Sequence, residues 1–439
     1  MRALSQIEQA LTITNVSYPL SAVCVIRLRK GPSAENLQSS LDRQQKHYPL
    51  LCSIIAERGG GFCFEMDLDE KPVKLQLIAR NGDDQWLGLV RNELNLGFDH
   101  SVPPLMRALY LEPSPGTGPS EIILSFHHAI VDAEFLMTFS DQLLTLAGQD
   151  KSGLEQVLST LSKTADPSPL LADILPQSYR MPRLFFCLLP FMSRQLKNEM
   201  IYKKWTGTLK DSVIPASSEN DVATLGFTEE ETISLIKWSR ENELSLNSII
   251  TATMLMVVNE FNYDNRKKML RAVQFANLRP FTHPPVAKHV AGSFIAMMRF
   301  NIPLSNSLSL ENKTIQIAKY FDSQLKESVK RGDKFLFSLL SKILIKKSFR
   351  DKKERLSATA LSYAGPIKLK KKYGAVELAD MHGFITNNSL GPELSGFGKI
   401  CFKRLSLDIN FLAAETDRDK AQQMTRAIKS SLLQLKPKA

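Results

Sequence analysis

The feature that most constrains this chain is a strand pattern followed directly by a helical pattern, with two histidines and an aspartate at the junction. Residues 121–126 form an apolar run rich in strand formers, and residues 133–146 place their apolar side chains at helical spacing. His127, His128 and Asp132 fall between the two patterns. Because ligand sites collect at strand ends, we interpret this junction as the candidate site.

The length of the chain favours two domains, since 439 residues exceed what one hydrophobic core usually supports. A composition of 43% apolar and 23% charged residues is ordinary for a globular protein. The sequence becomes polar after residue 147, and periodic patterns resume near residue 220. We therefore predict an N-terminal subdomain over residues 1–175, a crossover linker over 176–219 and a C-terminal subdomain over 220–439.

The cysteines and the apolar runs indicate a reducing compartment. The five cysteines are odd in number and scattered, which argues against a disulfide framework and a zinc ribbon. The N-terminus lacks the apolar segment of a signal peptide, and the longest apolar runs fall short of the roughly 18 residues of a membrane span. We expect a cytoplasmic protein.

A net charge of +11 predicts an anionic partner, such as nucleic acid, a lipid surface, an acidic carrier protein or a phosphate-bearing cofactor. The basic clusters at residues 342–353 and 368–372 carry few interleaved aromatic residues, which disfavours nucleic acid. They suit the phosphates of coenzyme A, an acyl carrier protein or anionic lipid, and solvated surfaces are the alternative.

The remaining periodicity predicts a mixed α/β fold with large, partly antiparallel sheets. Strands alternate neither strictly with helices nor at a repeat period. Residues 104–111 and 121–126 resemble two antiparallel strands of a hairpin. The other strand patterns lie at 21–29, 61–64, 270–275, 357–363, 383–387 and 405–411, and the helical patterns at 34–47, 86–96, 229–238, 245–261, 310–331 and 419–433.

Histidine is the usual general base near neutral pH. Adjacent histidines in extended backbone point to opposite sides, so one of His127 and His128 faces a substrate while the other packs inward. For the same reason a metal site made of both histidines and Asp132 is disfavoured. Asp132 either caps the following helix or is a buried carboxylate that pairs with an arginine, and the two interpretations are compatible.

Residues 127–133, HHAIVDA, resemble the HHxxxDG motif of the chloramphenicol-acetyltransferase-like superfamily. This group includes non-ribosomal peptide condensation domains, plant BAHD acyltransferases, wax ester synthases and polyketide-associated acyltransferases. Residues 4–9, 47–51 and 104–107 resemble further family segments in the right order. Arg279 stands where the family keeps an arginine that pairs with the motif aspartate.

The resemblance implies two chloramphenicol-acetyltransferase-like subdomains in a pseudo-dimer, with mixed sheets flanked by helices and an active-site channel between them. It implies that His128 is the catalytic base, and that His127 and the ion pair of Asp132 with Arg279 support the site. Ala133 replaces the motif glycine. If the motif needs glycine for a positive φ, alanine alters the loop.

The implied reaction transfers an acyl group from a thioester to a hydroxyl of an alcohol, sugar or lipid, and the implied partner is a small-molecule acceptor. The donor is acyl-coenzyme A or a phosphopantetheine-linked acyl group on a carrier protein, with no permanently bound cofactor and no metal. An amide-forming, condensation-like enzyme and a catalytically silent binding protein are the alternatives. The pseudo-dimeric architecture makes a monomer sufficient.

The apolar run at residues 184–192 precedes Arg194, Lys197, Lys203 and Lys204. This combination predicts peripheral contact with a membrane or the lining of an acyl-chain pocket. The alternative is a crossover helix that is buried between the domains and broken at Pro190.

Overall fold

The computed structural model describes residues 1–66, 71–113, 119–162, 168–206, 219–304, 309–351 and 355–437. The chain forms two units that interleave in sequence. Unit 1 comprises Met1–Ile174, Arg279–Phe294 and Ile367–Thr386, and unit 2 comprises Leu175–Leu278, Ile295–Pro366 and Asn387–Ala439. Two stretches of the second half of the chain thus belong to unit 1, whereas the sequence prediction divides the chain once, at residues 176–219.

Within the described residues, unit 1 holds a six-stranded sheet in the order β12-β13-β2-β7-β6-β5 and a three-stranded sheet in the order β1-β4-β3. The strands β13, β2, β7 and β6 pair antiparallel, and β5 pairs parallel to β6. The strands are β1 (Arg2–Ala3), β2 (Ser21–Lys30), β3 (Ile54–Arg58), β4 (Gly61–Glu65), β5 (Leu75–Ala79), β6 (Met106–Glu112), β7 (Ser120–His127), β12 (Lys372–Tyr373) and β13 (Val376–Ile385).

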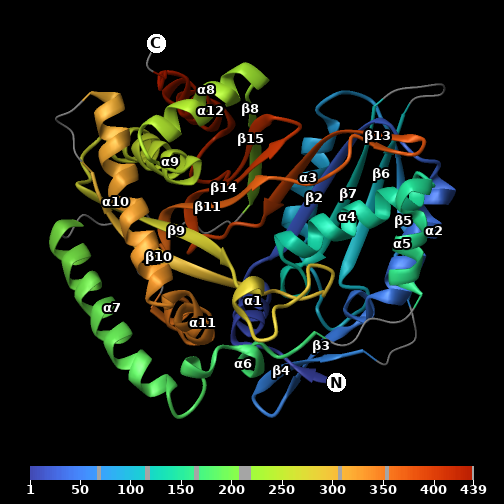
Figure 1. The fold of residues 1–439 in the computed structure, drawn as a ribbon, viewed down its shortest axis with the longest axis horizontal. Coiled ribbons are helices and arrows are strands. Elements are labelled where there is room, and N and C mark those ends of the chain that lie inside the picture. The colour runs from blue at the N-terminus through green and yellow to red at the C-terminus, as the bar shows by residue number, and fades with distance from the viewer. Residues whose placement is uncertain are drawn as a thin grey trace. The chain divides into compact units, whose positions relative to one another are not determined.

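Helices cover the large sheet of unit 1 (Figure 1). The helices α2 and α5 pack against α4, and α3 packs against β2, β7 and β13. The helical elements are α1 (Gln6–Ser17), α2 (Ala34–His47), η1 (Pro49–Cys52), α3 (Gln85–Leu96), η2 (His128–Ile130), α4 (Ala133–Ala147), α5 (Lys151–Leu161), α6 (Leu171–Ile174) and η4 (Arg279–Phe281).

The strand that leads to the histidines is the most enclosed strand of this sheet. Every residue of β7 is buried, and Ile122, Ile123 and Phe126 are fully so. Each large apolar side chain buried in this way stabilises the fold by about 1.5–3 kcal/mol. Because β7 pairs with β2 on one side and β6 on the other, its end is a rigid support for a site.

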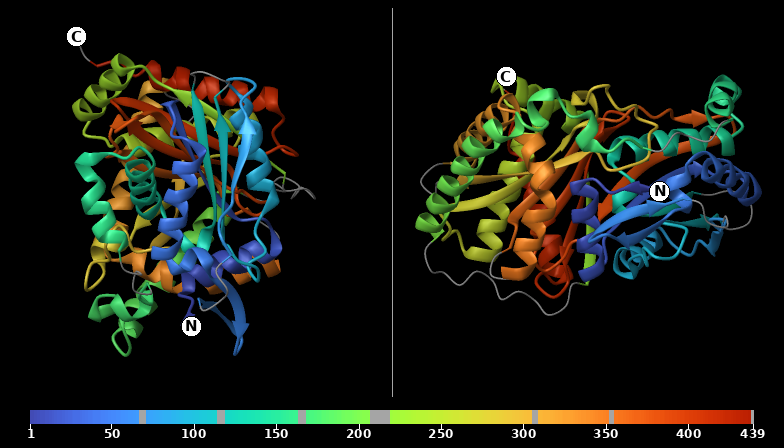
Figure 2. Two further views of the ribbon diagram at one scale, coloured as in Figure 1. Left: turned by 90° about the vertical axis from the view of Figure 1, so that its right-hand side faces the viewer. Right: turned by 90° about the horizontal axis from the view of Figure 1, so that it is seen from below.

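Unit 2 holds a second six-stranded sheet among its described residues, in the order β10-β9-β11-β14-β15-β8. Most residues of helix α9 are buried. The helix packs against α10, α12 and β11 (Figure 2). The elements are η3 (Gln177–Tyr179), α7 (Leu184–Thr206), β8 (Asn220–Gly226), α8 (Glu229–Glu241), α9 (Leu246–Tyr263), β9 (Met269–Asn277), β10 (Ile295–Pro303), α10 (Leu310–Lys330), α11 (Asp333–Asp351), β11 (Ser357–Pro366), β14 (Pro392–Cys401), β15 (Arg404–Leu412) and α12 (Arg418–Leu433).

The mixed α/β prediction is confirmed, but the alternative interpretation of a helix broken at Pro190 is wrong. Helix α7 continues through Pro190 and does not break there. Proline removes one backbone hydrogen bond, and Pro190 lies on the exposed side of the helix. The burial of Phe191 against Phe337 holds the helix across this point.

Sequence patterns also left out several elements, among them α1, β3, β5, α5, β8, β10, α11 and β14. Strand β10 does alternate buried and partly buried residues, but arginine and asparagine interrupt its apolar run. Within the part of the chain that the structure describes, no single helix is long and apolar enough to cross a membrane. The bent pair α8 and α9, which meet at 100°, meets the length and composition criteria only when the two are taken together.

Candidate active site

The two histidines occupy a turn between β7 and α4. His127 ends β7, and its backbone N–H donates to the carbonyl of Leu105 at 3.0 Å. His128 begins the 3-10 turn η2, and its N–H donates to the carbonyl of Leu20 at 3.4 Å. Because only His127 lies in extended backbone, the expected alternation of two extended residues is wrong, and the turn is what separates the two rings.

His127 is buried, with no exposed surface. Its Nδ1 accepts a hydrogen bond from the N–H of Ala129 at 3.2 Å, which places the ring proton on Nε2. Burial, together with the nearby His100 and His128, lowers the pKa of His127 to about 3. The ring therefore stays neutral at ordinary pH and serves to shape the turn.

His128 differs from His127 in reaching the surface, with an exposed fraction of 7%. Burial lowers the pKa of His128, while backbone groups of His128 and Val131 and the carboxylate of Asp132 oppose this shift. Its Nδ1 is buried without a partner of hydrogen-bonding geometry among the described residues. A neutral imidazole that keeps some exposure has the two properties that a proton acceptor for a substrate needs.

Asp132 is both a helix cap and a member of an ion pair, so its two predicted interpretations hold together. Its Oδ1 accepts from the N–H of Phe135 at 3.0 Å and caps α4. Its Oδ2 accepts from Nε of Arg279 at 2.8 Å and from the N–H of Phe294 at 3.1 Å. The side chains of both ionic partners are at most 3% exposed, and the remaining hydrogen bonds compensate for the loss of hydration.

Arg279 ties the loop that follows η4 to the histidine turn. Its Nη1 donates to the carbonyl of Ala287 at 2.8 Å, and its Nη2 donates to those of Val290 at 2.9 Å and Gly292 at 3.2 Å. Gly292 in turn donates its N–H to the carbonyl of Ile130 in η2 at 2.9 Å. The positive φ of 137° at Gly292 is one that L side chains rarely adopt.

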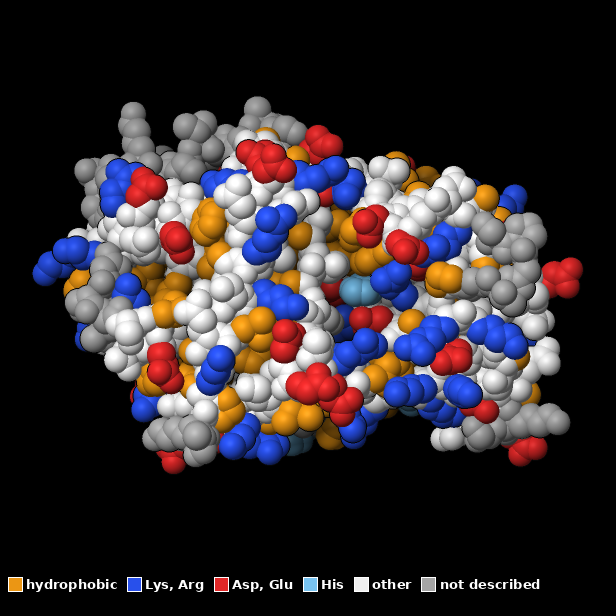
Figure 3. All heavy atoms as spheres, turned by 90° about the horizontal axis from the view of Figure 1, so that it is seen from above, with side chains coloured by type: hydrophobic (Ala, Val, Ile, Leu, Met, Phe, Trp, Pro, Cys, Tyr) orange, Lys and Arg blue, Asp and Glu red, His pale blue; other side chains and the backbone are white. Residues whose placement is uncertain are grey.

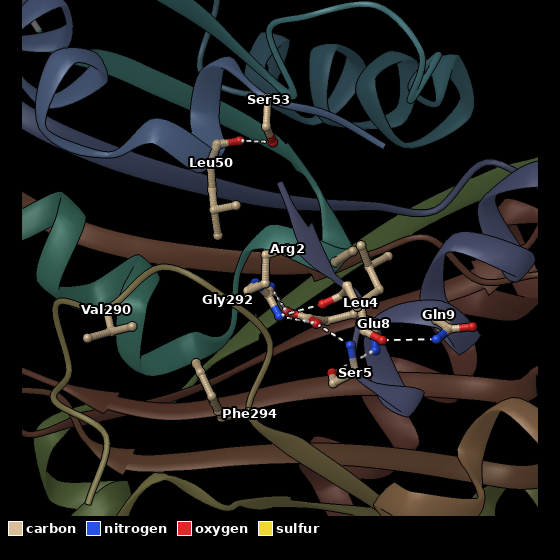
Figure 4. Close-up of polar contacts among 12 residues, drawn as sticks. Arg2, Leu4, Ser5, Glu8, Gln9, Leu50, Ser53, Val290, Gly292 and Phe294 are labelled. Atoms are coloured by element: carbon tan, nitrogen blue, oxygen red, sulfur yellow. Dashed lines mark hydrogen bonds and ion pairs between the residues drawn. The ribbon is translucent and has the colours of Figure 1, made fainter. Parts of the chain in front are cut away.

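The start of α1 forms a second polar cluster beside the turn, since α1 packs against η2. The side chain of Glu8 accepts from the backbone N–H of Ser5 at 2.7 Å and completes a capping box. The guanidinium of Arg2 binds the same carboxylate at 2.7 and 3.0 Å (Figure 4). This cluster holds the helix that supports the histidine turn.

The segment around Tyr48 supports α4, the helix that Asp132 caps. The Tyr48 ring packs edge-on against Phe135 at a centroid distance of 5.1 Å. Its hydroxyl donates to Oε1 of Gln142 at 2.8 Å. A little further along the chain, the hydroxyl of Ser53 donates to the carbonyl of Leu50 at 2.9 Å and closes η1 (Figure 4).

Sequence reasoning missed the residues behind His127. The ring centroids of Phe98 and His100 lie 6.3 and 6.4 Å from that of His127. Arg107 places its guanidinium 3.9 Å from the centroid of Phe98 and donates from Nε to Glu93 at 2.8 Å. The family-like segment at 104–107 contained this arginine, but its partner Phe98 lies outside that segment.

Ala133 leaves the turn intact. It is the first residue of α4, and it is not among the residues with a positive φ. An alanine in a helical conformation carries no steric penalty, so the altered loop considered from the sequence does not arise through backbone strain. Among the described residues, no group of three or more histidine, cysteine, aspartate or glutamate side chains could hold a metal ion.

The arrangement of strands and helices matches that of solved structures. Polyketide synthase associated protein 5 from Mycobacterium tuberculosis superposes with a TM-score of 0.68 and 16% identity, over 99% of this chain and 98% of that one. Trichothecene 15-O-acetyltransferase from Fusarium sporotrichioides superposes with a TM-score of 0.75 and 12% identity, over 99% and 95%. The chain therefore has the fold of the chloramphenicol-acetyltransferase-like superfamily, and the resemblance and the mixed α/β class predicted from the sequence are confirmed.

Sequence comparison gives two further matches. A family model described as "Phthiocerol/phthiodiolone dimycocerosyl transferase C-terminus" matches residues 216–396. The phthiocerol/phthiodiolone dimycocerosyl transferase of Mycobacterium leprae (strain TN) is 23% identical to this chain over 265 residues. That match covers 58% of this chain and 57% of the relative, so it spans little more than half of the length of each.

Proposed function

We propose that this protein is an acyltransferase that moves an acyl group from a thioester donor to a hydroxyl of a lipid acceptor. The observation that carries the proposal is His128, a neutral imidazole at the end of a buried strand, which keeps 7% exposure where its neighbour has none. The likeness to a dimycocerosyl transferase supports a lipid acceptor. The superposition on a 15-O-acetyltransferase supports a hydroxyl as the attacked group.

In the proposed reaction His128 removes the proton from the acceptor hydroxyl while its oxygen forms a bond to the thioester carbonyl carbon. The carbonyl π electrons move to the oxygen, and the resulting oxyanion needs hydrogen-bond donors. When the carbonyl re-forms, the carbon–sulfur bond breaks, and the imidazolium returns the proton to the leaving thiolate. The products are an ester and a free thiol, and His128 ends neutral.

The supporting residues keep the imidazole in place without touching the reacting atoms. Asp132 is already bound by Arg279 and two backbone N–H groups, so it holds the turn rather than a substrate proton. His127 has its Nδ1 occupied by the N–H of Ala129. The donor is acyl-coenzyme A or an acyl group on a carrier protein, and each supplies the same thioester chemistry.

The test is free-thiol release from a panel of acyl-coenzyme A and acyl-carrier donors, with and without long-chain alcohol acceptors. We expect acceptor-dependent release in the wild type, and a loss of about 10²- to 10⁴-fold in rate for His128→Ala, as is typical when a general base is removed. His289→Gln is the matched control, because this histidine is exposed on the loop that Arg279 holds. It should retain full activity.

Other results would change the assignment. Full activity of His128→Ala would remove the histidine from the chemistry. Release that depends on amine rather than alcohol acceptors would indicate amide formation. No release from any donor, with a folded wild type, would favour a catalytically silent binding protein.

A further inference from the structure

Helix α7 carries a row of large apolar side chains on the side that faces solvent. We call it the outward stripe. From Phe186 onward the side chains follow one another at intervals of three or four residues, and Phe185 precedes Leu189 by four, so they share one face of the helix. The members and their exposed fractions are Phe185 (56%), Phe186 (78%), Leu189 (57%), Met192 (41%), Leu196 (62%) and Met200 (72%).

The opposite side of α7 is anchored to the rest of unit 2, which fixes the direction of the stripe. Phe191 is buried and packs edge-on against Phe337 at a centroid distance of 5.0 Å. The carboxylate of Glu199 accepts from Arg271 at 2.7 Å and from Arg299 at 3.2 Å. The helix cannot turn its apolar face inward without breaking these contacts.

The charges beside the stripe are basic. Lys197, Lys203 and Lys204 are exposed, whereas Glu199, the one acidic residue in the sequence of α7, is bound inward. Basic side chains occur over other surfaces as well, intermixed with acidic ones on the face drawn in Figure 3. Charge alone does not distinguish α7, but lysines that flank a continuous apolar row do.

We propose that the outward stripe docks α7 onto the surface of an anionic phospholipid bilayer. A helix of this kind lies in the plane of the interface, with its apolar side chains among the acyl chains and its lysines at the lipid phosphates. A second copy of the chain would bring lysines against lysines. An acidic protein surface would pair with the lysines but would offer no apolar surroundings for the six large apolar side chains. The inference goes beyond the proposed transferase activity. Only the advantage of docking, access to lipid acceptors, rests on that proposed function.

The test measures co-sedimentation of the full chain with vesicles of phosphatidylglycerol mixed with phosphatidylcholine, and with vesicles of phosphatidylcholine alone. We expect the triple variant Phe186→Ser/Leu196→Ser/Met200→Ser to lower the partition coefficient on the mixed vesicles about 100-fold, because the transfer of apolar area drives insertion. The variant Lys197→Gln/Lys203→Gln/Lys204→Gln should lower it at least about 10-fold on the mixed vesicles and hardly at all on phosphatidylcholine.

A matched control replaces exposed apolar residues on other helices. Val16→Ser/Leu96→Ser/Ile233→Ser should leave binding unchanged, because these residues are 62%, 67% and 54% exposed but lie outside α7. Unchanged thermal melting of the α7 triple variant would show that it still folds. Its thiol release with short, soluble substrates should also be unchanged, which separates a failure of this inference from a failure of the proposed function.

Two results would overturn the docking surface. The first is a wild type that binds neither kind of vesicle. The second is an α7 triple variant that binds as well as the wild type. A wild-type dimer that dissociates in the variant, without vesicle binding, would assign the stripe to a second copy and equally contradict the proposal.

Discussion

Two buried ion pairs, one in each unit, differ in what surrounds them. In unit 1, Nε of Arg279 lies 2.8 Å from Oδ2 of Asp132, and the side chains are 2% and 3% exposed. In unit 2, Nζ of Lys399 lies 3.5 Å from Oδ2 of Asp408, and neither side chain is exposed. The residues of the first pair are 147 positions apart in the chain, and those of the second are 9 apart.

The first pair positions the histidine turn, whereas the second pair only links two neighbouring strands of a sheet. Arg279 and Asp132 use their remaining hydrogen bonds on the backbone of α4 and of the stretch 287–294, so together they fix the histidine turn. Lys399 donates to its cross-strand neighbour Ser406 at 2.6 Å, and its pair joins the adjacent strands β14 and β15. A buried pair is poor evidence of stability by itself, so the value of the first pair lies in what it positions.

The largest effect should come from breaking the pair in unit 1. We expect Arg279→Met to lower the free energy of unfolding by about 3–5 kcal/mol, because Asp132 would remain buried without its cation. Thiol release should fall with it, since the histidine turn loses its anchor. Urea unfolding measures the first effect, and Arg266→Met, at an exposed arginine, is the control. A loss below about 1 kcal/mol would contradict the role given to the pair.

The next effect is on the pH dependence of the free energy of unfolding, because His127 is buried in the turn beside Asp132. In the unfolded chain His127 binds a proton below pH 6.5, whereas in the folded protein it stays neutral down to about pH 3. The stabilisation is therefore complete above pH 6.5 and is lost as the pH falls, by up to about 1.4 kcal/mol per pH unit. From pH 6.5 to pH 5 this amounts to about 2 kcal/mol, and His128 adds to it in the same direction.

His127→Asn isolates that contribution, because the amide oxygen of asparagine can accept the N–H of Ala129 in place of Nδ1. Urea unfolding at several pH values should show a smaller loss of stability on acidification in the variant than in the wild type. An identical pH dependence in both proteins would mean that His127 does not stay neutral in the folded state.

The smallest effect should come from replacing the pair in unit 2 as a whole. Apolar residues of similar volume often replace a buried pair at little cost, so Lys399→Met/Asp408→Leu should unfold within about 1 kcal/mol of the wild type or be more stable. The parallel double variant Arg279→Met/Asp132→Leu should stay destabilised, because the carbonyls of Ala287 and Val290 lose their donor. Equal behaviour of the two double variants would remove the distinction between the pairs.

Much of the site was predictable because its parts are local. The strand before His127, the helix after Asp132 and the cap between them follow from the spacing of apolar residues and from one carboxylate. The partner of Asp132 did not follow from the residues alone; its assignment to Arg279 came from resemblance to a family. The contacts of Phe98 with His127 and Arg107 carried no local signal.

The errors in the fold have the same origin. The predicted break at Pro190 rested on the local cost of proline in a helix, about 3 kcal/mol, which packing of the neighbouring Phe191 can offset. Helix α11 was not predicted, because the basic residues near 342–350 interrupt its apolar pattern, although its first half is buried. Local propensity is a weak guide wherever burial outweighs it.

The sequence by itself determined many of the strands and helices, where several helices begin, and that two histidines lie at one junction, because these features depend on neighbours in the chain. Only the tertiary structure decided that β13 completes the sheet of β2, that Arg279 closes on Asp132, that His128 rather than His127 keeps its exposure, and that the outward stripe of α7 faces solvent. Each of these depends on contacts between distant segments. Such contacts form when the free energy gained by burying surface exceeds the entropy lost in closing long loops. Local sequence patterns contain no information about this balance.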